Sequence, residues 1–339
     1  MKLILIGFGS VGQGFVQILR DKRADLAARY GFTPQIAAVV TRTRGSLYHP
    51  NGLNLDALLT DFAAYPDTPG LVRGWDAARI VRDCPADVML EASPTNFETG
   101  QPALDLCRLA LEHGKHIVLA NKGPVAVAYR ELNALAHSSG RAFRFEGTVM
   151  AGTPSLRLGM QALAGCTITA ARGILNGTTN YMLTQMENGV PYADVLAQAQ
   201  QLGYAEADPT ADVDGWDAAA KAIIVAQALF NKKLTFADMD VRGISHLTPP
   251  DIDAARAAGE RWKLIATVTP EGGSVQPTRL PLSHPLAGVS GSTNAITYTT
   301  DLLGDVTLIG SGAGRIQTGF ALLSDVLEIF TKFTPSFTQ

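Results

Sequence analysis

The stretch LILIGFGSVG, residues 3–12, decides the fold of the N-terminal part of the chain. Its first four residues form a short apolar run suited to a buried strand, and residues 11–20 then follow a helical pattern. Between the two, Gly7, Gly9 and Gly12 form the pattern G-x-G-x-x-G. In this context the glycines permit a tight turn, a close approach to a pyrophosphate, and close helix packing. The stretch therefore predicts a dinucleotide-binding unit, with a purely structural glycine turn as the alternative.

Short β-rich runs alternate with helical stretches throughout residues 1–150, as is typical of βαβ units over a parallel sheet. Strands are expected at residues 3–6, 35–40, 87–91, 116–120 and 142–146. One long helical stretch is expected over residues 96–113, with Gly114 as its C-cap. The predicted fold class is α/β, with a Rossmann-type doubly wound parallel sheet forming an NAD(P)-binding domain over residues 1–150.

The character of the sequence changes after residue 150. Helices are expected at residues 192–202 and 217–230, with Asp214 as an N-cap candidate, and β-like runs at 265–269 and 295–300. Residues 151–309 are therefore predicted to form a mixed α+β second domain. Residues 310–339 contain a glycine loop followed by an apolar helical pattern, which predicts a C-terminal segment that returns to the nucleotide-binding domain.

The composition limits the classes of protein to consider. A chain of 339 residues with 46% hydrophobic and 17% charged residues is typical of a globular enzyme with two domains. The net charge of -3 and the lack of a basic stripe argue against a nucleic-acid partner. No apolar run reaches the roughly 18 residues of a membrane helix. Three widely spaced cysteines, Cys84, Cys107 and Cys166, suit reduced thiols and a cytoplasmic location.

The coenzyme preference depends on the residues that follow the second predicted strand. NAD-binding domains carry an acid there that holds the ribose 2′-hydroxyl, and residues 37–45 contain no acid. Arg42 and Arg44 stand there instead, and a guanidinium can bind a 2′-phosphate through two hydrogen bonds. We therefore predict a preference for NADP over NAD, with exposed loop arginines as the alternative.

Five carboxylates precede one lysine in residues 203–221, GYAEADPTADVDGWDAAAK. Asp217 and Lys221 are four residues apart on a predicted helix, so they share one face. A desolvated Lys221 could exchange a proton with an alcohol or carbonyl oxygen, with Asp217 orienting it. The loop carboxylates Glu206 and Asp212 could hold an ammonium group. The alternatives are a surface ion pair and a divalent metal site, although the segment lacks histidines and the D-x-D-x-D-G order.

Two further stretches are candidates for binding a small substrate. Lys122 follows the strand predicted at residues 116–120, and ligands bind beyond the carboxyl ends of such strands. Residues 173–181, GILNGTTNY, hold small polar residues whose N–H and hydroxyl groups suit a carboxylate. A solvated loop lysine and an ordinary turn are the respective alternatives.

Several separated strings together resemble the homoserine dehydrogenase family over nearly the whole chain. The most specific are ILNGTTNYML from Ile174, GYAEADPTADVDGWDAAAKAIIVA from Gly203 and ANKGPVA from Ala120, supported by EGTVMAGTP from Glu146, SHPLAGVSGSTNAI from Ser283 and GSGAG from Gly310. The resemblance implies NAD(P)-dependent interconversion of L-homoserine and L-aspartate 4-semialdehyde, in threonine, methionine and isoleucine biosynthesis. It also implies a homodimer formed through the second domain, and the short form without a C-terminal ACT regulatory domain.

The resemblance further implies roles for individual residues. Lys221 transfers the proton, with Asp217 beside it and Lys122 as a second lysine facing the reacting oxygen. The substrate is bound by Glu206, Asp212, Gly177, Thr178 and Tyr204. The coenzyme is bound by Gly7, Gly9, Ser10, Val11, Gly12, Arg42, Arg44, Ser93, Lys122 and Gly312. A structural monovalent cation, usually Na+, is held by Glu146, Val149, Ala151 and Thr153.

The chain departs from the family pattern in two places. Arg42 stands where several relatives carry an acid, and Gln317 and Gly319 replace an expected proline and alanine. Two other classes of protein stay open at this point. A different NAD(P)-dependent amino-acid dehydrogenase would not need the NGTTNY and AEADPT strings together, and a non-catalytic NADP-binding regulator would leave Lys122 and Lys221 without a role.

Overall fold

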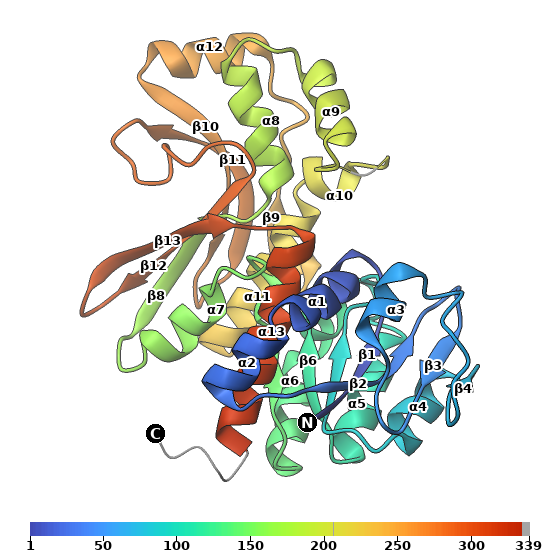
Figure 1. The fold of residues 1–339 in the computed structure, drawn as a ribbon. Helices are drawn as coiled ribbons and strands as arrows, with labels where there is room; N and C mark the ends of the chain where they lie inside the picture. Colours follow the sequence, from blue (N-terminus) through green and yellow to red (C-terminus); the bar gives the residue numbers. More distant parts are fainter. Residues whose placement is uncertain (206, 334–339) are drawn as a thin grey trace. The chain divides into compact units, whose positions relative to one another are not determined.

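The computed structural model describes residues 1–205 and 207–333 of the chain. These residues fold into two compact units (Figure 1). The first consists of Met1–Gly152 together with Gly314–Gln339, and the second is Thr153–Ala313. The sequence placed the two boundaries after residues 150 and 309. Within the described residues, no helix is long and apolar enough to cross a membrane.

The first unit contains a seven-stranded sheet in the order β4-β3-β2-β1-β5-β6-β7. Its parallel strands are β1 (Lys2–Ile6), β2 (Gln35–Val40), β5 (Val88–Glu91), β6 (His116–Leu119) and β7 (Phe143–Arg144). Two short antiparallel strands, β3 (Ser46–Tyr48) and β4 (Val72–Arg73), extend one edge. The central strands are apolar and almost completely buried, as expected for a parallel sheet covered on both faces. The predicted α/β class is confirmed, but β3 and β4 were not predicted.

The helices of the first unit are α1 (Ser10–Asp21), α2 (Arg23–Tyr30), α3 (Leu55–Thr60), α4 (Ala77–Asp83), α5 (Ala103–Glu112), α6 (Lys122–Ser138) and α13 (Arg315–Phe333). The single helix predicted over residues 96–113 is wrong in its first part, since α5 begins only at Ala103. The side chain of Asn96 accepts hydrogen bonds from the N–H groups of Glu98 and Thr99, and this turn replaces a helical start. Gly114 does follow the helix in the left-handed conformation, with a φ of 72°.

Helix α13 belongs to the first unit and packs on α1. Several of its apolar residues, including Leu322 and Ile329, are completely buried in the same core as residues of β1. The two helices approach closely at a pair of glycines. A Cβ atom at Gly14 would lie 2.2 Å from the carbonyl oxygen of Arg315, and one at Gly319 would lie 2.6 Å from the nitrogen of Phe15. This close approach explains why glycine stands at position 319.

The second unit contains a six-stranded sheet in the order β13-β12-β8-β10-β11-β9. Its strands are β8 (Ile168–Ile174), β9 (Met239–Val241), β10 (Glu260–Val268), β11 (Gly273–Pro281), β12 (Thr293–Thr300) and β13 (Gly304–Ser311). All neighbouring strands are antiparallel except β9 and β11. Antiparallel pairs can be joined by short turns, and such a turn links β12 to β13.

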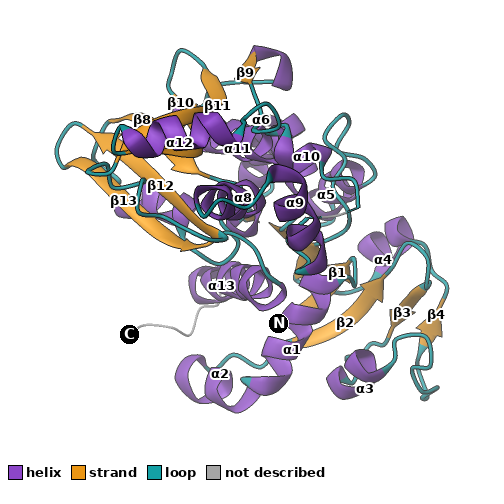
Figure 2. Ribbon diagram, turned by 90° about the horizontal axis from the view of Figure 1, so that it is seen from above, coloured by secondary structure: helices purple, strands orange, loops and turns teal. Residues whose placement is uncertain are grey.

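The helices of the second unit are α7 (Ser155–Arg157), α8 (Gly177–Glu187), α9 (Tyr192–Gln201), α10 (Thr210–Val213), α11 (Trp216–Phe230) and α12 (Pro249–Ala257). Helices α8, α11 and α12 pack against strands of the sheet (Figure 2). Helix α11 is apolar on nearly all sides, and residues Ala218 to Gln227 are buried without interruption. The prediction of Asp214 as its N-cap is wrong, because Gly215, with a φ of 90°, occupies that position.

Candidate active site

The glycine turn between β1 and α1 has the geometry that its sequence predicted. Gly7 adopts a φ of 94°, and a Cβ atom there would lie 2.5 Å from the carbonyl group of Ala92. A Cβ atom at Gly12 would lie 2.4 Å from the oxygen of Gly7, whereas one at Gly9 would meet no described atom within 4 Å. Gly7 and Gly12 are therefore needed for packing, and Gly9 leaves the backbone open to a ligand. Ser10 and Val11 begin α1, where N–H groups are available to a phosphate.

The two arginines after β2 differ in their surroundings. Residues 41–45 form a turn closed by a hydrogen bond from the Thr41 N–H to the Gly45 oxygen, at 2.9 Å. Arg44 donates to the Phe8 oxygen at 2.6 Å, and its guanidinium lies 5.1 Å from the centre of the Phe62 ring. Both Arg42 and Arg44 are exposed on this turn, and both are accessible to a ligand. Arg44 in addition holds the turn to the glycine loop.

Lys122 is the first residue of α6 rather than part of a solvated loop. The side chain of Asn121 caps this helix by accepting a hydrogen bond from the Gly123 N–H at 3.0 Å. The Lys122 ammonium nitrogen lies 6.0 Å from the centre of the Phe97 ring. Ser93, after β5, donates from its N–H to the Glu91 carboxylate at 2.8 Å, and its hydroxyl donates to the same oxygen. Lys122 and Ser93 therefore follow the carboxyl ends of two adjacent parallel strands.

Three segments of the second unit meet around a buried lysine. The Lys221 ammonium lies 2.7 Å from Asp217 Oδ2, and it donates to the Leu175 oxygen at 2.7 Å. Asn176 donates from Nδ2 to Asp212 at 2.6 Å and to Asp217 at 3.0 Å. The amide of Asn176 thus joins the two carboxylates and holds them in one cluster. The sequence contained Asn176 in the NGTTNY string but did not identify this role.

Burial decides between the two interpretations of the Asp217–Lys221 pair. The side chains of Lys221 and Asp217 are only 9% and 17% exposed. The alternative of a solvated surface ion pair is therefore wrong. A buried ammonium held by a carboxylate and a carbonyl oxygen keeps one fixed position, which is what a proton-transfer group requires.

The residues predicted to bind substrate lie beside this cluster where they are described. Asn176 caps α8, and Gly177 and Thr178 are the first two residues of that helix. The Thr178 hydroxyl donates to the Tyr204 oxygen at 2.6 Å, and the Tyr204 ring lies 5.1 Å from that of Tyr181. Glu206, the other predicted carboxylate, lies outside the described residues. The N-terminus of α8 therefore provides N–H donors close to the lysine and its two aspartates.

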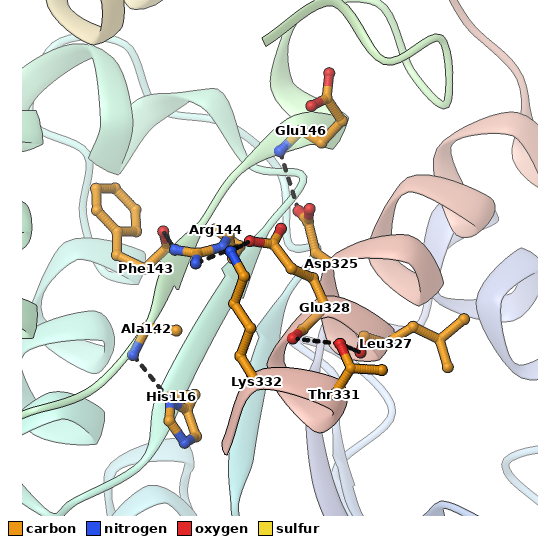
Figure 3. Close-up of polar contacts among 10 residues, drawn as sticks. All are labelled: His116, Ala142, Phe143, Arg144, Glu146, Asp325, Leu327, Glu328, Thr331 and Lys332. Atoms are coloured by element: carbon orange, nitrogen blue, oxygen red, sulfur yellow. Dashed lines mark hydrogen bonds and ion pairs between the residues drawn. The ribbon is translucent and has the colours of Figure 1, made fainter. Parts of the chain in front are cut away.

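The residues expected to hold a monovalent cation are mostly in the first unit. Glu146 is buried and donates from its N–H to Asp325 Oδ2 at 3.0 Å, and Figure 3 shows its carboxylate directed away from Asp325. Val149 and Ala151 follow in the same buried turn, where Ala151 has an unusual φ of 47°. Thr153 begins the second unit and donates to the Ser311 oxygen at 2.9 Å. One carboxylate and nearby carbonyl oxygens are the hard donors that a cation such as Na+ needs.

Gly312, the remaining predicted coenzyme residue, lies in the second unit after β13. A Cβ atom there would lie 2.0 Å from Asn294 Cγ, so only glycine fits at this position.

In the described residues, no group of three or more His, Cys, Asp or Glu side chains could hold a metal ion.

A glycine-turn nucleotide fold and a buried lysine held by an aspartate define an NAD(P)-dependent dehydrogenase acting on a small polar substrate. The comparisons with known proteins specify the family. Residues 154–327 match the model of homoserine dehydrogenase, and residues 7–146 match that of the homoserine dehydrogenase NAD-binding domain. The chain belongs to the homoserine dehydrogenase family and has NAD(P)-dependent homoserine dehydrogenase activity.

Individual relatives agree with this assignment. The chain is 45% identical to the NAD(+)-dependent homoserine dehydrogenase of Pseudomonas canavaninivorans, over 98% of this chain and 97% of that one. A candidate homoserine dehydrogenase from Archaeoglobus fulgidus has a crystal structure similar to 97% of this chain and 99% of its own, at 36% identity and a TM-score of 0.88. A hyperthermophilic archaeal homoserine dehydrogenase, in complex with NADPH, has 27% identity, a TM-score of 0.84 and 98% coverage of both chains.

Proposed function

We propose that Lys221 is the residue that exchanges a proton with the substrate oxygen when L-homoserine and L-aspartate 4-semialdehyde are interconverted. The observation that carries this proposal is the burial of its ammonium between Asp217 and the Leu175 oxygen. The bound coenzyme supplies hydride transfer at its nicotinamide ring. In the oxidation direction a neutral lysine accepts the hydroxyl proton, and Asp217 holds the lysine in place. Lys122 is proposed as a second lysine facing the reacting oxygen.

The other site residues are proposed to bind the substrate's two charged ends. Asp212, with Glu206, takes the ammonium group, because a carboxylate held by Asn176 offers a fixed negative charge. Gly177 and Thr178 at the start of α8 hold the substrate carboxylate through helix N-terminal N–H groups. Tyr204, linked to Thr178, lines the same pocket.

The test of this site is turnover with L-homoserine in a coupled assay of coenzyme reduction. Lys221→Ala and Lys122→Ala should each lower kcat by about 100-fold or more, the usual contribution of a general acid or base. If both variants retain near-normal turnover, the assignment fails.

We propose that NADP is the preferred coenzyme and that Arg42 binds its 2′-phosphate. Both arginines are exposed on the turn after β2, but Arg44 is held there by the Phe8 oxygen and the Phe62 ring. The names of the relatives point in different directions, since the Pseudomonas enzyme is called NAD(+)-dependent and the archaeal structure contains NADPH. Arg42→Ala should raise KM for NADP with little effect on KM for NAD. Arg44→Ala is the matched control and should affect both coenzymes alike, and unchanged discrimination in Arg42→Ala would reject the proposal.

We propose that Glu146, Val149, Ala151 and Thr153 hold a structural Na+ ion. Support comes from the buried Glu146 and from the left-handed backbone of Ala151. Such an ion would order the turn and take no part in proton transfer. Isothermal titration with NaCl against choline chloride measures it, with Glu146→Gln as the variant expected to lose the heat of binding. Equal heats for the two proteins would contradict the proposal.

We also propose a homodimer formed through the second unit, in the cytoplasm. Strand β13 forms one edge of the sheet of this unit. Exposed apolar side chains lie in this strand, at Ile309, and in the turn before it, at Leu302 and Leu303. Light scattering should give twice the chain mass for the wild type and the monomer mass for Ile309→Lys. A monomeric wild type would reject the dimer.

The three cysteines support the proposed cytoplasmic location, because they are unpaired. Burial raises the pKa of Cys84 to about 11, which makes that thiol unreactive.

A further inference from the structure

A buried carboxylate at the end of β5 has no role in the mechanism described above. Glu91 is the last residue of that strand and is completely buried. Its Oε1 atom accepts hydrogen bonds from the Ser93 N–H at 2.8 Å, from the Ser93 hydroxyl and from Asn121 Nδ2 at 3.3 Å. Its Oε2 atom is buried and has no hydrogen-bond partner in the described residues. A carboxyl group buried this way is costly, so its presence needs a reason other than stability.

One side of this carboxylate supports the glycine turn. The hydrogen bonds to Ser93 fix the backbone directly after β5. The Gly7 turn packs on that same backbone, since a Cβ atom at Gly7 would lie 2.5 Å from the Ala92 oxygen and 2.6 Å from the Ser93 nitrogen. A shift of the segment at Ala92 and Ser93 would therefore move the turn that receives the coenzyme pyrophosphate.

The other side of the carboxylate supports the start of α6. Asn121 donates from Nδ2 to Glu91 Oε1, and its N–H donates to the Glu91 main-chain oxygen at 3.3 Å. With its own Oδ1 atom Asn121 caps the helix at Gly123. A Cβ atom at Gly123 would lie 2.5 Å from the Asn96 oxygen, so the helix start is packed tightly and cannot shift freely. Lys122 lies between these two anchored residues.

We propose that Glu91 is a positioning residue for the dehydrogenase reaction, one that holds the coenzyme turn and the Lys122 helix start in a single hydrogen-bonded unit. The proposal rests on the role of Lys122 given above. Burial raises the pKa of Glu91. The Oε1 atom can nevertheless accept the three hydrogen bonds whether the carboxyl group is charged or neutral, and the side-chain oxygen of a glutamine could accept them too. The function of the group is therefore its acceptor geometry rather than its charge.

The first test compares Glu91→Ala with the isosteric Glu91→Gln. Glu91→Ala should lower kcat by up to about 100-fold, the effect of misplacing a catalytic group by roughly 1 Å, and should raise the Kd of the coenzyme. Glu91→Gln keeps the acceptor oxygen, so its kcat and its coenzyme Kd should both stay close to the wild-type values. An equal loss in the two variants would overturn the proposal. Glu328→Ala is the control, because it removes a largely buried carboxylate of the same unit, one bound to Arg144 and Lys332 (Figure 3). It should lower Tm without changing the coenzyme Kd.

The second test uses a double-mutant cycle with Lys122→Ala. If Glu91 acts through Lys122, Glu91→Ala should cause little further loss of kcat in the Lys122→Ala background, and additive losses would contradict this. If Lys122→Ala alone has normal turnover, the proposed role of Lys122 fails. The coenzyme Kd of Glu91→Ala then tests whether Glu91 still supports the coenzyme turn, and an unchanged Kd overturns the inference. Should Glu91→Ala not fold, Asn121→Asp keeps the helix cap but loses the donor to Glu91. Its kcat should fall, and normal kcat would overturn the proposal.

Discussion

Two lysines of the second unit are buried in different surroundings. Lys221 on α11 faces the Asp217 carboxylate at 2.7 Å, and its side chain is 9% exposed. Lys263 on β10 is completely buried and donates to two neutral oxygens, those of Asn180 at 3.1 Å and Val289 at 2.7 Å. Burial lowers the pKa of Lys263 to about 8. We propose that Lys221 rather than Lys263 transfers the proton, because Lys221 is in direct contact with a carboxylate and lies beside the start of α8, where the substrate is proposed to bind.

The largest expected effect separates the two lysines by turnover. Lys221→Met should lower kcat for homoserine oxidation by about 100- to 10,000-fold, because it removes the proton acceptor. Lys263→Met has the same change of charge and shape in the same unit and should keep kcat near the wild-type value. Steady-state kinetics of the two purified variants measures this, with circular dichroism to verify folding. A comparable loss of kcat in both would show that the assay reports burial of a lysine rather than catalysis.

A smaller effect is expected when only the carboxylate partner is changed. Asp217→Asn keeps the shape of the side chain but removes the carboxylate that holds the Lys221 ammonium at 2.7 Å. Because the lysine is then held less firmly, kcat for homoserine oxidation should fall by about 10-fold, less than in Lys221→Met. Steady-state kinetics at saturating homoserine and coenzyme measures the loss. An unchanged kcat would contradict the role given to Asp217.

The smallest expected effect concerns stability and the core lysine. The folded chain holds Lys263 with a pKa of about 8, below the ordinary value of 10.5. Between these two values the unfolded chain binds more protons than the folded chain, so stability rises with pH. Relative to Lys263→Met, the free energy of unfolding of the wild type should increase by about 2 kcal/mol between roughly pH 7.5 and 9.5. Urea unfolding of both proteins at the two pH values tests this, and a constant difference would reject it.

The sequence could predict features that depend on neighbouring residues. The Gly7 turn, the strands β1 and β2 and the Asp217–Lys221 pair follow from local patterns, and the structure has them within a residue or two. Such features form from contacts a few residues apart, where period and spacing carry the information. The helix predicted over residues 96–113 was too long, because a capped turn at Asn96 competes locally with a helical start.

The sequence could not predict features that depend on distant contacts. Asn176 meets Asp212 and Asp217 across more than thirty positions of the chain, and Asp325 reaches Glu146 across 179. No local pattern states that Asn176 joins the two aspartates or that Glu91 supports Asn121. The same limit separates Arg42 from Arg44, which are alike in sequence and differ only because Phe8 and Phe62 lie beside one of them.

The most direct test of the central claim is the turnover of L-homoserine by the wild type and Lys221→Met at saturating coenzyme and substrate. If Lys221 accepts the substrate proton, kcat of the variant should be lower by about 100-fold or more, while its Kd for the coenzyme stays near the wild-type value. A variant with kcat near the wild-type value would contradict the claim that the buried lysine of α11 transfers the proton.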